Sequence, residues 1–212
     1  MTPVPAVDGP IGAGLRLATR VVGPMGNNAY LLADGTDALL IDAADEAEVL
    51  LGLVAGLNLV GVVTTHRHAD HIRALAAVVA ATGAPAYAGT PDAAAITAAT
   101  GVPCRPLWDG DTVTIGGVAL AVIGLVGHTP GSITLAHTPP EAPDRLFTGD
   151  ALFPGGVGKT RSGSDFDSLF HDVTTKLFDQ FGDDTVVHPG HGASTTLGHE
   201  RPNLAEWRAR GW

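Results

Sequence analysis

Three histidines and one aspartate stand within six residues of one another, directly after an apolar run at positions 59–63. These four residues are His66, His68, Asp70 and His71. The apolar run is rich in Val and bounded by polar residues, which indicates a buried strand, and the Ala/Val/Leu-rich segment 70–82 has helical character. Imidazole and carboxylate groups together suit Zn, Fe or Mn. The spacing therefore predicts a metal-binding turn between a strand and a helix, with a solvated His-rich loop as the alternative.

Three further positions offer metal ligands in a similar setting. His128, Asp150 and His191 each follow the end of a predicted strand and have glycine neighbours. Glycine lets the backbone turn sharply and approach a site closely. A single loop histidine is a weak signal, because most such residues lie on the surface. Together with the first turn, however, these positions supply five histidines and two aspartates at strand ends.

The elements that must position these side chains can be predicted from apolar alternation and turn residues. We expect strands at 15–22, 29–32, 38–41, 59–63, 84–88, 112–115, 118–125, 132–137, 145–148 and 185–188, the last being the final strand. We expect helices at 45–55, with Asp45 as a possible cap, and at 70–82, 91–99, 164–181 and 201–210. Residues 1–20 are broken by Pro and Gly and form a lead segment, and 153–164 is a long Gly-rich loop. In each half of the chain, the predicted strands thus come first and are followed by alternating strands and helices.

The composition is that of a globular protein. The chain has 212 residues, 45% of them hydrophobic and 16% charged, which suits one domain spanning 1–212. The formal net charge of −10 and the lack of a Lys/Arg run disfavour a nucleic-acid partner. No secretory signal and no uninterrupted apolar stretch of membrane-spanning length is visible, so we expect a cytoplasmic protein without membrane contact.

The order and spacing of the candidate ligands resemble the metallo-β-lactamase superfamily across nearly the whole chain. The motifs are His66-x-His68-x-Asp70-His71, Gly-His128-Thr-Pro-Gly, Gly-Asp150 and Pro-Gly-His191. The segments 149–159 and 189–202 look most like the short, single-domain glyoxalase II-type hydrolases. This resemblance implies an α+β fold, an αββα sandwich of two mixed sheets with helices on the outer faces. It also implies two metal sites, one held by His66, His68 and His128, the other by Asp70, His71 and His191, with Asp150 bridging them.

The resemblance further implies a hydrolase that cleaves a thioester of a low-molecular-weight thiol. Two divalent ions, zinc first with iron or manganese as alternatives, would supply a hydroxide near neutral pH. Asp70 would then be catalytic by orienting that nucleophile, and Lys159 would bind the thiol carrier, with Arg161 as a weaker candidate. The larger glyoxalase II enzymes continue into a glutathione-binding helical domain, whereas only 21 residues follow His191 here, so another small thiol is a possible carrier.

Two other activities fit the same resemblance. A mononuclear iron persulfide dioxygenase on this fold would use only His66, His128 and Asp150, a set of two histidines and one carboxylate. A lactonase or β-lactamase is a third possibility. All three hypotheses, the thioester hydrolase, the dioxygenase and the lactonase or β-lactamase, imply a small-molecule substrate.

Overall fold

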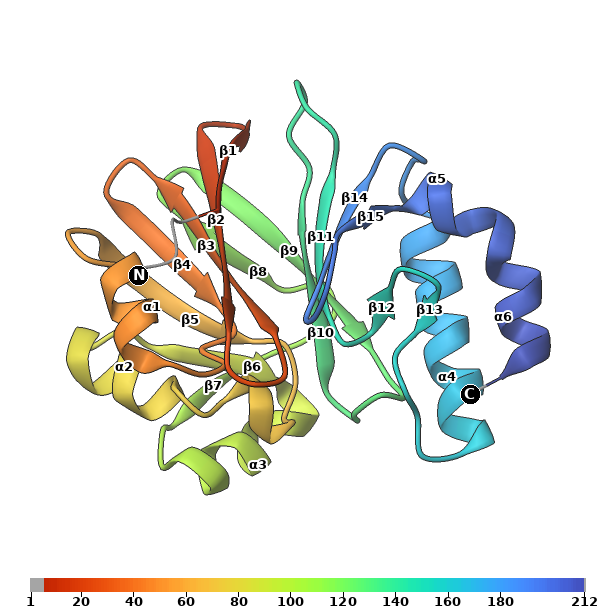
Figure 1. The fold of residues 1–212 in the computed structure, drawn as a ribbon, viewed down its shortest axis with the longest axis horizontal. Coiled ribbons are helices and arrows are strands. Elements are labelled where there is room, and N and C mark those ends of the chain that lie inside the picture. The colour runs from red at the N-terminus through yellow and green to blue at the C-terminus, as the bar shows by residue number, and fades with distance from the viewer. Residues whose placement is uncertain (1–5, 212) are drawn as a thin grey trace.

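Two mixed β-sheets face each other in the computed structural model, which describes residues 6–211, and helices cover their outer faces (Figure 1). The seven-stranded first sheet follows chain order, antiparallel from β1 to β4 and parallel from β4 to β7. Its strands are β1 (Ala6–Gly12), β2 (Leu15–Val22), β3 (Asn27–Asp34), β4 (Asp37–Ile41), β5 (Asn58–Thr64), β6 (Ala86–Gly89) and β7 (Cys104–Leu107). Helices α1 (Ala47–Leu53), α2 (Leu75–Thr82) and α3 (Thr90–Thr100) belong to this half.

The second sheet has six strands in the order β15-β14-β11-β10-β9-β8, and only the β11/β14 pair is parallel. Its strands are β8 (Thr112–Ile115), β9 (Val118–Leu125), β10 (Ser132–His137), β11 (Arg145–Gly149), β14 (Val186–Pro189) and β15 (Thr195–Thr196). A small hairpin is formed by β12 (Leu152–Phe153) and β13 (Gly156–Val157). The helices of this half are α4 (Gly163–Asp172), which continues into a π-helical segment at Val173–Phe178, then α5 (Leu197–Glu200) and α6 (Leu204–Arg210).

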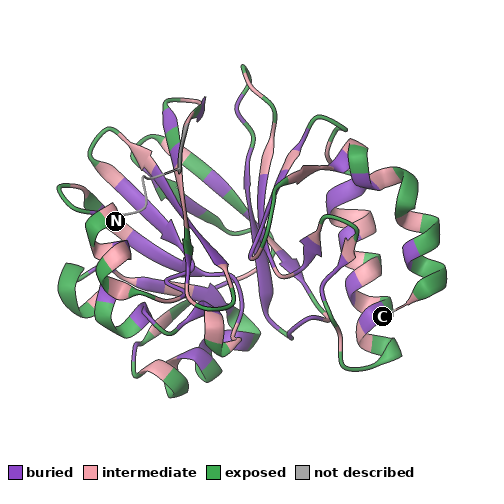
Figure 2. Ribbon diagram, viewed as in Figure 1, coloured by how far each residue is buried: buried purple, intermediate pink, exposed green. Residues whose placement is uncertain are grey.

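Strand β4 shows why the sheets are covered on both sides. Successive side chains of a strand point to opposite faces. Leu40 packs into the cluster shared with α1 and α2, whereas Leu39 and Ile41 pack into the cluster between the two sheets. A third cluster, which contains Leu177 and Trp207, lies between the second sheet and its helices. Buried strands and helices with exposed outer faces appear together in Figure 2.

The predicted αββα sandwich is therefore confirmed, and several strand bounds are confirmed to the residue. Strands β2, β8, β9 and β10 have the predicted bounds. The prediction was wrong for part of the lead segment, because residues 6–12 form β1 ahead of the predicted strand at 15–22. Residues 1–5 of that segment lie outside the described part. Strand β1 lies at the edge of its sheet and has two register irregularities, and Pro is tolerated at such an edge.

Other short elements differ from the prediction. The Gly-rich segment contains the β12/β13 hairpin, and β15 follows the strand expected to be the last. Helix α1 starts after Glu46, which has a left-handed φ of 48° and makes no side-chain cap, so Asp45 does not cap it. No helix among residues 6–211 is long and apolar enough to cross a membrane.

Candidate metal centre

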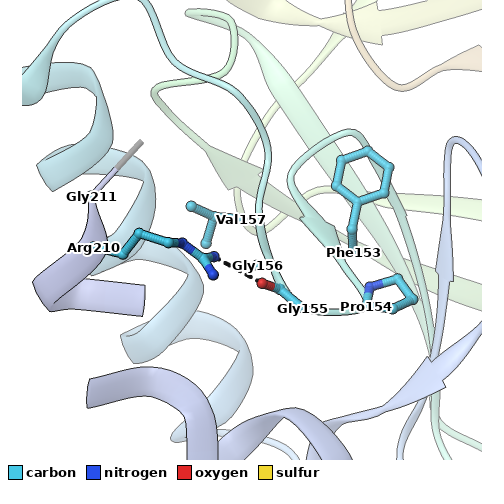
Figure 3. A pocket seen from close by; sticks show the side chains of 7 residues that line it. All are labelled: Phe153, Pro154, Gly155, Gly156, Val157, Arg210 and Gly211. Atoms are coloured by element: carbon cyan, nitrogen blue, oxygen red, sulfur yellow. Dashed lines mark hydrogen bonds between the residues drawn. The ribbon is translucent and has the colours of Figure 1, made fainter. Parts of the chain in front are cut away.

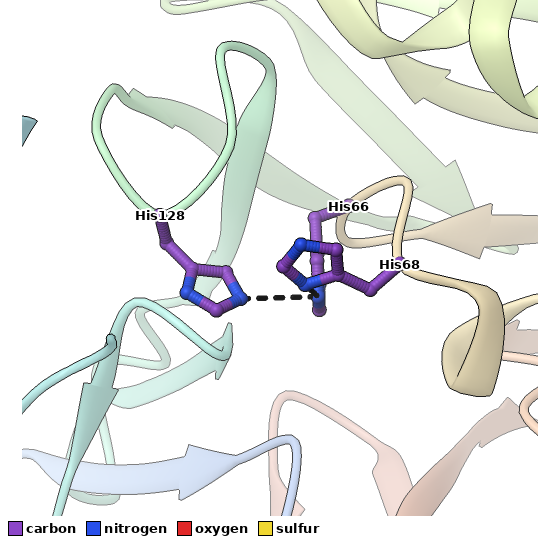
Figure 4. A group of neighbouring side chains, drawn as sticks. All are labelled: His66, His68 and His128. Atoms are coloured by element: carbon purple, nitrogen blue, oxygen red, sulfur yellow. Dashed lines mark hydrogen bonds between the residues drawn. The ribbon is translucent and has the colours of Figure 1, made fainter. Parts of the chain in front are cut away.

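The strand ends that carry the predicted ligands meet in one place. The turn after β5 provides the first four, and the turns after β9, β11 and β14 provide the other three. In the first group, His66, His68 and His128 bring ring nitrogens together from two of these turns (Figure 4). His66 Nε2 lies 3.0 Å from His68 Nδ1 and 3.3 Å from His128 Nε2. Three imidazoles thus point at a common centre.

A second group lies beside the first and consists of Asp70, His71 and His191. His191 Nε2 is 3.2 Å from Asp70 Oδ2 and 3.3 Å from His71 Nε2. The side chains of Asp70 and His191 are 14% and 23% exposed, while that of His71 is fully buried. A substrate would therefore meet Asp70 and His191 at the mouth of the centre.

Asp150 lies between the two groups. Its Oδ2 is 3.7 Å from His128 Nε2 and 3.6 Å from His191 Nε2, and its Oδ1 is 3.3 Å from His71 Nε2. Oδ1 is buried and has no hydrogen-bond partner among the described residues. The three residues His66, His71 and Asp150 also form a possible ligand set of their own. A carboxylate in this position suits a bridge between two cations.

The electrostatics of the centre favour a cation. Burial lowers the pKa of His66, His68 and His128, which keeps these imidazoles neutral, the form that binds metals. His71 behaves differently. Burial opposes its protonation, but the carboxylates of Asp42 and Asp150 outweigh that effect and raise its pKa to about 10. The carboxylates of Asp42 and Asp150 therefore favour positive charge around His71. Divalent cations fit the donor set because they would supply such charge and satisfy the buried oxygen of Asp150.

Asp42 orients His71, and the sequence analysis did not identify it as a site residue. It follows β4 with a left-handed φ of 60° and is almost fully buried. Its carboxylate accepts hydrogen bonds from the Thr65 backbone N–H at 2.7 Å, from Thr65 Oγ1 at 2.8 Å and from His71 Nδ1 at 2.8 Å. The bond to Nδ1 leaves Nε2 of His71 as the atom that faces the centre.

Asp92, at the start of α3, ties two ligand turns together. It is fully buried and accepts hydrogen bonds from the Arg67 N–H at 3.1 Å, from Thr129 Oγ1 at 2.6 Å and from the Gly131 N–H at 3.1 Å. Arg67 stands between His66 and His68, and Thr129 follows His128. The same carboxylate therefore fixes both turns that make up the first group.

Asn27 and Asn28, at the start of β3, connect the first sheet to the turn that carries His191. The Asn28 N–H donates to Gly190 O at 2.7 Å, and its side-chain amide donates to Gly192 O at 2.9 Å. Asn27 Nδ2 donates to Asp70 Oδ2 at 2.9 Å. Like Asp42 and Asp92, these residues act across long sequence separations, and no motif marks them.

Lys159, the predicted substrate-binding residue, supports the centre through its backbone. Its carbonyl accepts a 2.7 Å hydrogen bond from His128 Nδ1, which turns Nε2 of His128 toward the other ligands. The Lys159 residue is exposed. Arg161, two residues further along the chain, lines a cavity next to His128. Substrate binding by the Lys159 side chain stays a prediction.

A larger hollow of about 420 Å³ lies between the β12/β13 hairpin and α6 (Figure 3). Arg210 closes one side by donating to Gly155 O at 2.9 Å. None of its seven described lining residues is a candidate metal ligand. Its link to the centre is Phe153, whose ring lies 6.5 Å from that of His191. The hollow is thus a neighbour of the metal centre and not its reaction site.

The family model of the metallo-beta-lactamase superfamily matches residues 22–195. That range includes every side chain of the two ligand groups and Asp150. The chain therefore belongs to the metallo-beta-lactamase superfamily.

The chain is also similar to individual known proteins. A protein named hydroxyacylglutathione hydrolase from Anaeromyxobacter dehalogenans (strain 2CP-C) is 37% identical over 180 residues, which cover 84% of this chain but only 64% of that protein. A solved structure described as TTHA1623 in a di-iron-bound form is 34% identical, with a TM-score of 0.70 over 86% of this chain and 96% of that one. ETHE1 from Myxococcus xanthus is 28% identical, with a TM-score of 0.75 over 91% of this chain and 84% of that one.

Proposed function

We propose that this protein is a dinuclear metal-dependent hydrolase that cleaves a thioester of a low-molecular-weight thiol. The observation that carries the proposal is the second complete ligand group, Asp70, His71 and His191, next to the three imidazoles of the first. Asp150 lies between the groups with a buried oxygen that lacks a partner among the described residues. A single cation would leave one of these groups unused.

Two bound divalent cations would lower the pKa of a coordinated water and polarise the substrate carbonyl. Zinc suits the five imidazoles and two carboxylates, and the similar chain with a di-iron site supports iron as an alternative. His66, His68 and His128 would hold one cation, and Asp70, His71 and His191 the other. This assignment follows the grouping of ligand atoms within 4.8 Å of one another.

We assign to Asp70 the role of proton acceptor for the attacking water. Its Oδ2 is held by Asn27, and its side chain is one of the partly exposed members of the centre. Its carboxylate can accept a proton from the water as the new C–O bond forms. The C–S bond then breaks, and the thiolate leaves without a general acid because thiolates are weak bases compared with alkoxides or amide anions. The proton held by Asp70 passes to solvent or to the departing thiolate.

A thioester is also supported by the name of the curated relative, hydroxyacylglutathione hydrolase. This chain covers less than two thirds of that relative, so glutathione itself does not carry over as the thiol. The formal net charge of −10 supports a small-molecule substrate over a nucleic acid.

The proposal is tested by measuring S-lactoylglutathione hydrolysis with metal-replete protein, beside oxygen uptake on glutathione persulfide. We expect thioester loss without oxygen uptake. The variants Asp70→Ala and His191→Ala should each lose one metal equivalent and most of the activity. Full activity with a single bound metal would contradict the dinuclear mechanism, and oxygen uptake without thioester loss would support the dioxygenase instead.

A further inference from the structure

The hollow of about 420 Å³ between the β12/β13 hairpin and α6 is mostly apolar. Phe153, Pro154 and Val157 line it with their side chains, and two glycines between them, Gly155 and Gly156, complete that wall (Figure 3). Small-molecule sites are concave and lined mainly by apolar side chains. The hollow therefore has the size and the surface of a binding site for an apolar group.

Arg210 is the one charged side chain among the described lining residues, and its guanidinium is already engaged. Nη1 lies 3.1 Å from Glu206 Oε1, and Nη2 donates to Gly155 O at 2.9 Å. The nearby Glu206 carboxylate offsets the charge of Arg210. The hollow thus favours an uncharged occupant.

The tip of the hairpin is held on both sides of Gly155, which fixes the shape of the hollow. Its N–H donates to Glu200 Oε2 at 2.9 Å, and its carbonyl accepts the bond from Arg210. Glu200 is almost fully buried, and its other oxygen accepts a hydrogen bond from Thr195 Oγ1 at 2.6 Å. A site that is already formed loses little conformational entropy when it binds a ligand.

Phe153 connects the hollow to the metal centre. It stands three residues after Asp150, and its ring centroid lies 6.5 Å from that of His191. Both side chains are partly exposed, so a flexible chain can pass from the mouth of the centre along the Phe153 ring. Only a group of several carbons would extend from the centre into the hollow.

We propose that this hollow binds the apolar end of the substrate's acyl group. The proposal rests on the hydrolase function proposed above and narrows its substrates to thioesters whose acyl group is an apolar chain of several carbons. The acyl carbonyl stays at the metal centre until the C–S bond breaks, whereas the thiol departs. A preformed apolar hollow beside His191 therefore suits the acyl group better than the thiol.

The test compares two thioesters of N-acetylcysteamine, the butyryl and the hexanoyl derivative, with metal-replete protein. The two added methylenes are remote from the carbonyl and leave its reactivity unchanged. Their burial in the hollow should raise kcat/KM about tenfold in the wild type. Gly156→Val fills the hollow from its wall, because a Cβ there meets only the flexible end of Arg210, at 3.0 Å. This variant should bring the ratio close to one.

Gly117→Val is the matched control, since Gly117 lies outside the hollow and a Cβ there meets nothing within 4 Å. It should keep the wild-type ratio. A ratio close to one in the wild type, or a tenfold ratio kept by Gly156→Val, would overturn the acyl site and leave the hydrolase standing. S-butyl and S-hexyl thioacetate vary the thiol instead. A preference for the hexyl compound that Gly156→Val removes would overturn the assignment, because it would place the thiol in the hollow.

The acid products test the hollow without the reaction. In calorimetry, metal-replete wild type should bind hexanoate about tenfold more tightly than butyrate, and Gly156→Val should bind the two equally. If neither acyl thioester is cleaved, the hydrolase proposal fails for these substrates, and the comparison of the two acids decides on the hollow alone. Equal affinities of the wild type for the two acids would overturn the acyl site.

Discussion

Asp42 contributes more to the centre than its absence from the ligand motifs suggests. Asp42 is not a member of either ligand group. Its carboxylate nevertheless accepts hydrogen bonds from Thr65, the residue before the first ligand, and from the ring of His71. Such partners orient the ligand and increase its basicity. The left-handed φ of 60° at this position also explains the residue type, because Asp and Asn tolerate that conformation better than most residues.

The variant Asp42→Asn should weaken the second metal site by about ten- to a hundredfold, because it removes the charge next to His71 and keeps the shape and the allowed backbone conformation. Metal content after dialysis measures this, and we expect it to fall from two equivalents toward one. Asp37→Asn, at the other end of β4, is the control and should retain both. Two retained equivalents in Asp42→Asn would show that the carboxylate does not support His71 as a ligand.

The seven candidate ligands could be predicted because they form local patterns: four lie together in the turn after one strand, and three stand next to Gly at the ends of other strands. The residues that orient them have no local pattern. Asp42 lies 23 residues from Thr65, and Asp92 lies 37 from Thr129. Only the folded chain brings these carboxylates to their partners, so no spacing rule could identify them.

At the scale of elements, close backbone approach explains why glycine precedes three of the candidate ligands, His128, Asp150 and His191. A Cβ on Gly190 would lie 2.2 Å from Asp150 Oδ1 and 2.7 Å from His71 Cε1. Real Cβ atoms essentially never come this close to other atoms, so a larger residue must displace one of these side chains. The turn after β14 can therefore bring His191 into the centre only if residue 190 has no Cβ.

Gly190→Ala should reduce the metal content to one equivalent or less and lower thioesterase activity at least about tenfold, because it displaces Asp150 or His71 from the centre. Gly117→Ala is the matched control, since a Cβ there meets nothing within 4 Å, and it should retain both metals. Elemental analysis beside far-UV circular dichroism separates loss of metal from loss of fold. Wild-type metal content in Gly190→Ala would contradict the close approach.

His188 in β14 should make the folded chain less stable in acid. It is buried, stacks on Phe147, accepts a hydrogen bond from Arg145 at 3.0 Å and contacts Ser194 Oγ at 3.0 Å. Burial and the Arg145 charge lower its pKa from 6.5 to about 3. In the unfolded chain, His188 therefore takes up a proton below about pH 6.5. In the folded chain it stays neutral down to about pH 3.

The free energy of unfolding should thus fall as the pH falls through this window, with a contribution from His188 of up to about 1.4 kcal/mol per pH unit. His188→Gln removes the titrating group, so its stability should depend less steeply on pH between about 4 and 6. Urea unfolding of chelator-treated protein measures both slopes without a contribution from metal release. Identical slopes would mean that His188 does not stay neutral in the folded chain.

Elements with strong alternation and glycine turns could be predicted from sequence, whereas those set by tertiary contacts could not. Strands β8 and β9 have the predicted bounds because Gly116-Gly117 separates two alternating runs. Helix α2 begins at Leu75 instead of residue 70 because the backbone N–H groups of Arg73 and Ala74 donate to Ala44 O and Ala43 O in the loop between β4 and α1. Those contacts replace a first helical turn, and no sequence pattern encodes them.

At the scale of the whole molecule, the metal centre joins the two sheets. Four candidate ligands follow β5 of the first sheet, and three follow β9, β11 and β14 of the second. Between the sheets lies an apolar layer that includes Leu39, Ile133 and Phe147. Bound cations would therefore cross-link the two halves at one end of this layer, and metal affinity would add to the stability of the whole fold.

Metal removal should consequently lower the melting temperature. With free metal about a thousandfold above its Kd, each site adds about 4 kcal/mol to the free energy of unfolding, which corresponds to roughly 10 °C for a chain of this size. Scanning calorimetry before and after chelation, with zinc added back as the reversal, measures this shift. Asp150→Asn should show a smaller shift, because its side chain lies between both groups. An unchanged melting temperature after verified metal removal would mean that protein contacts alone, such as those of Asn28 and Asp92, hold the two halves in register.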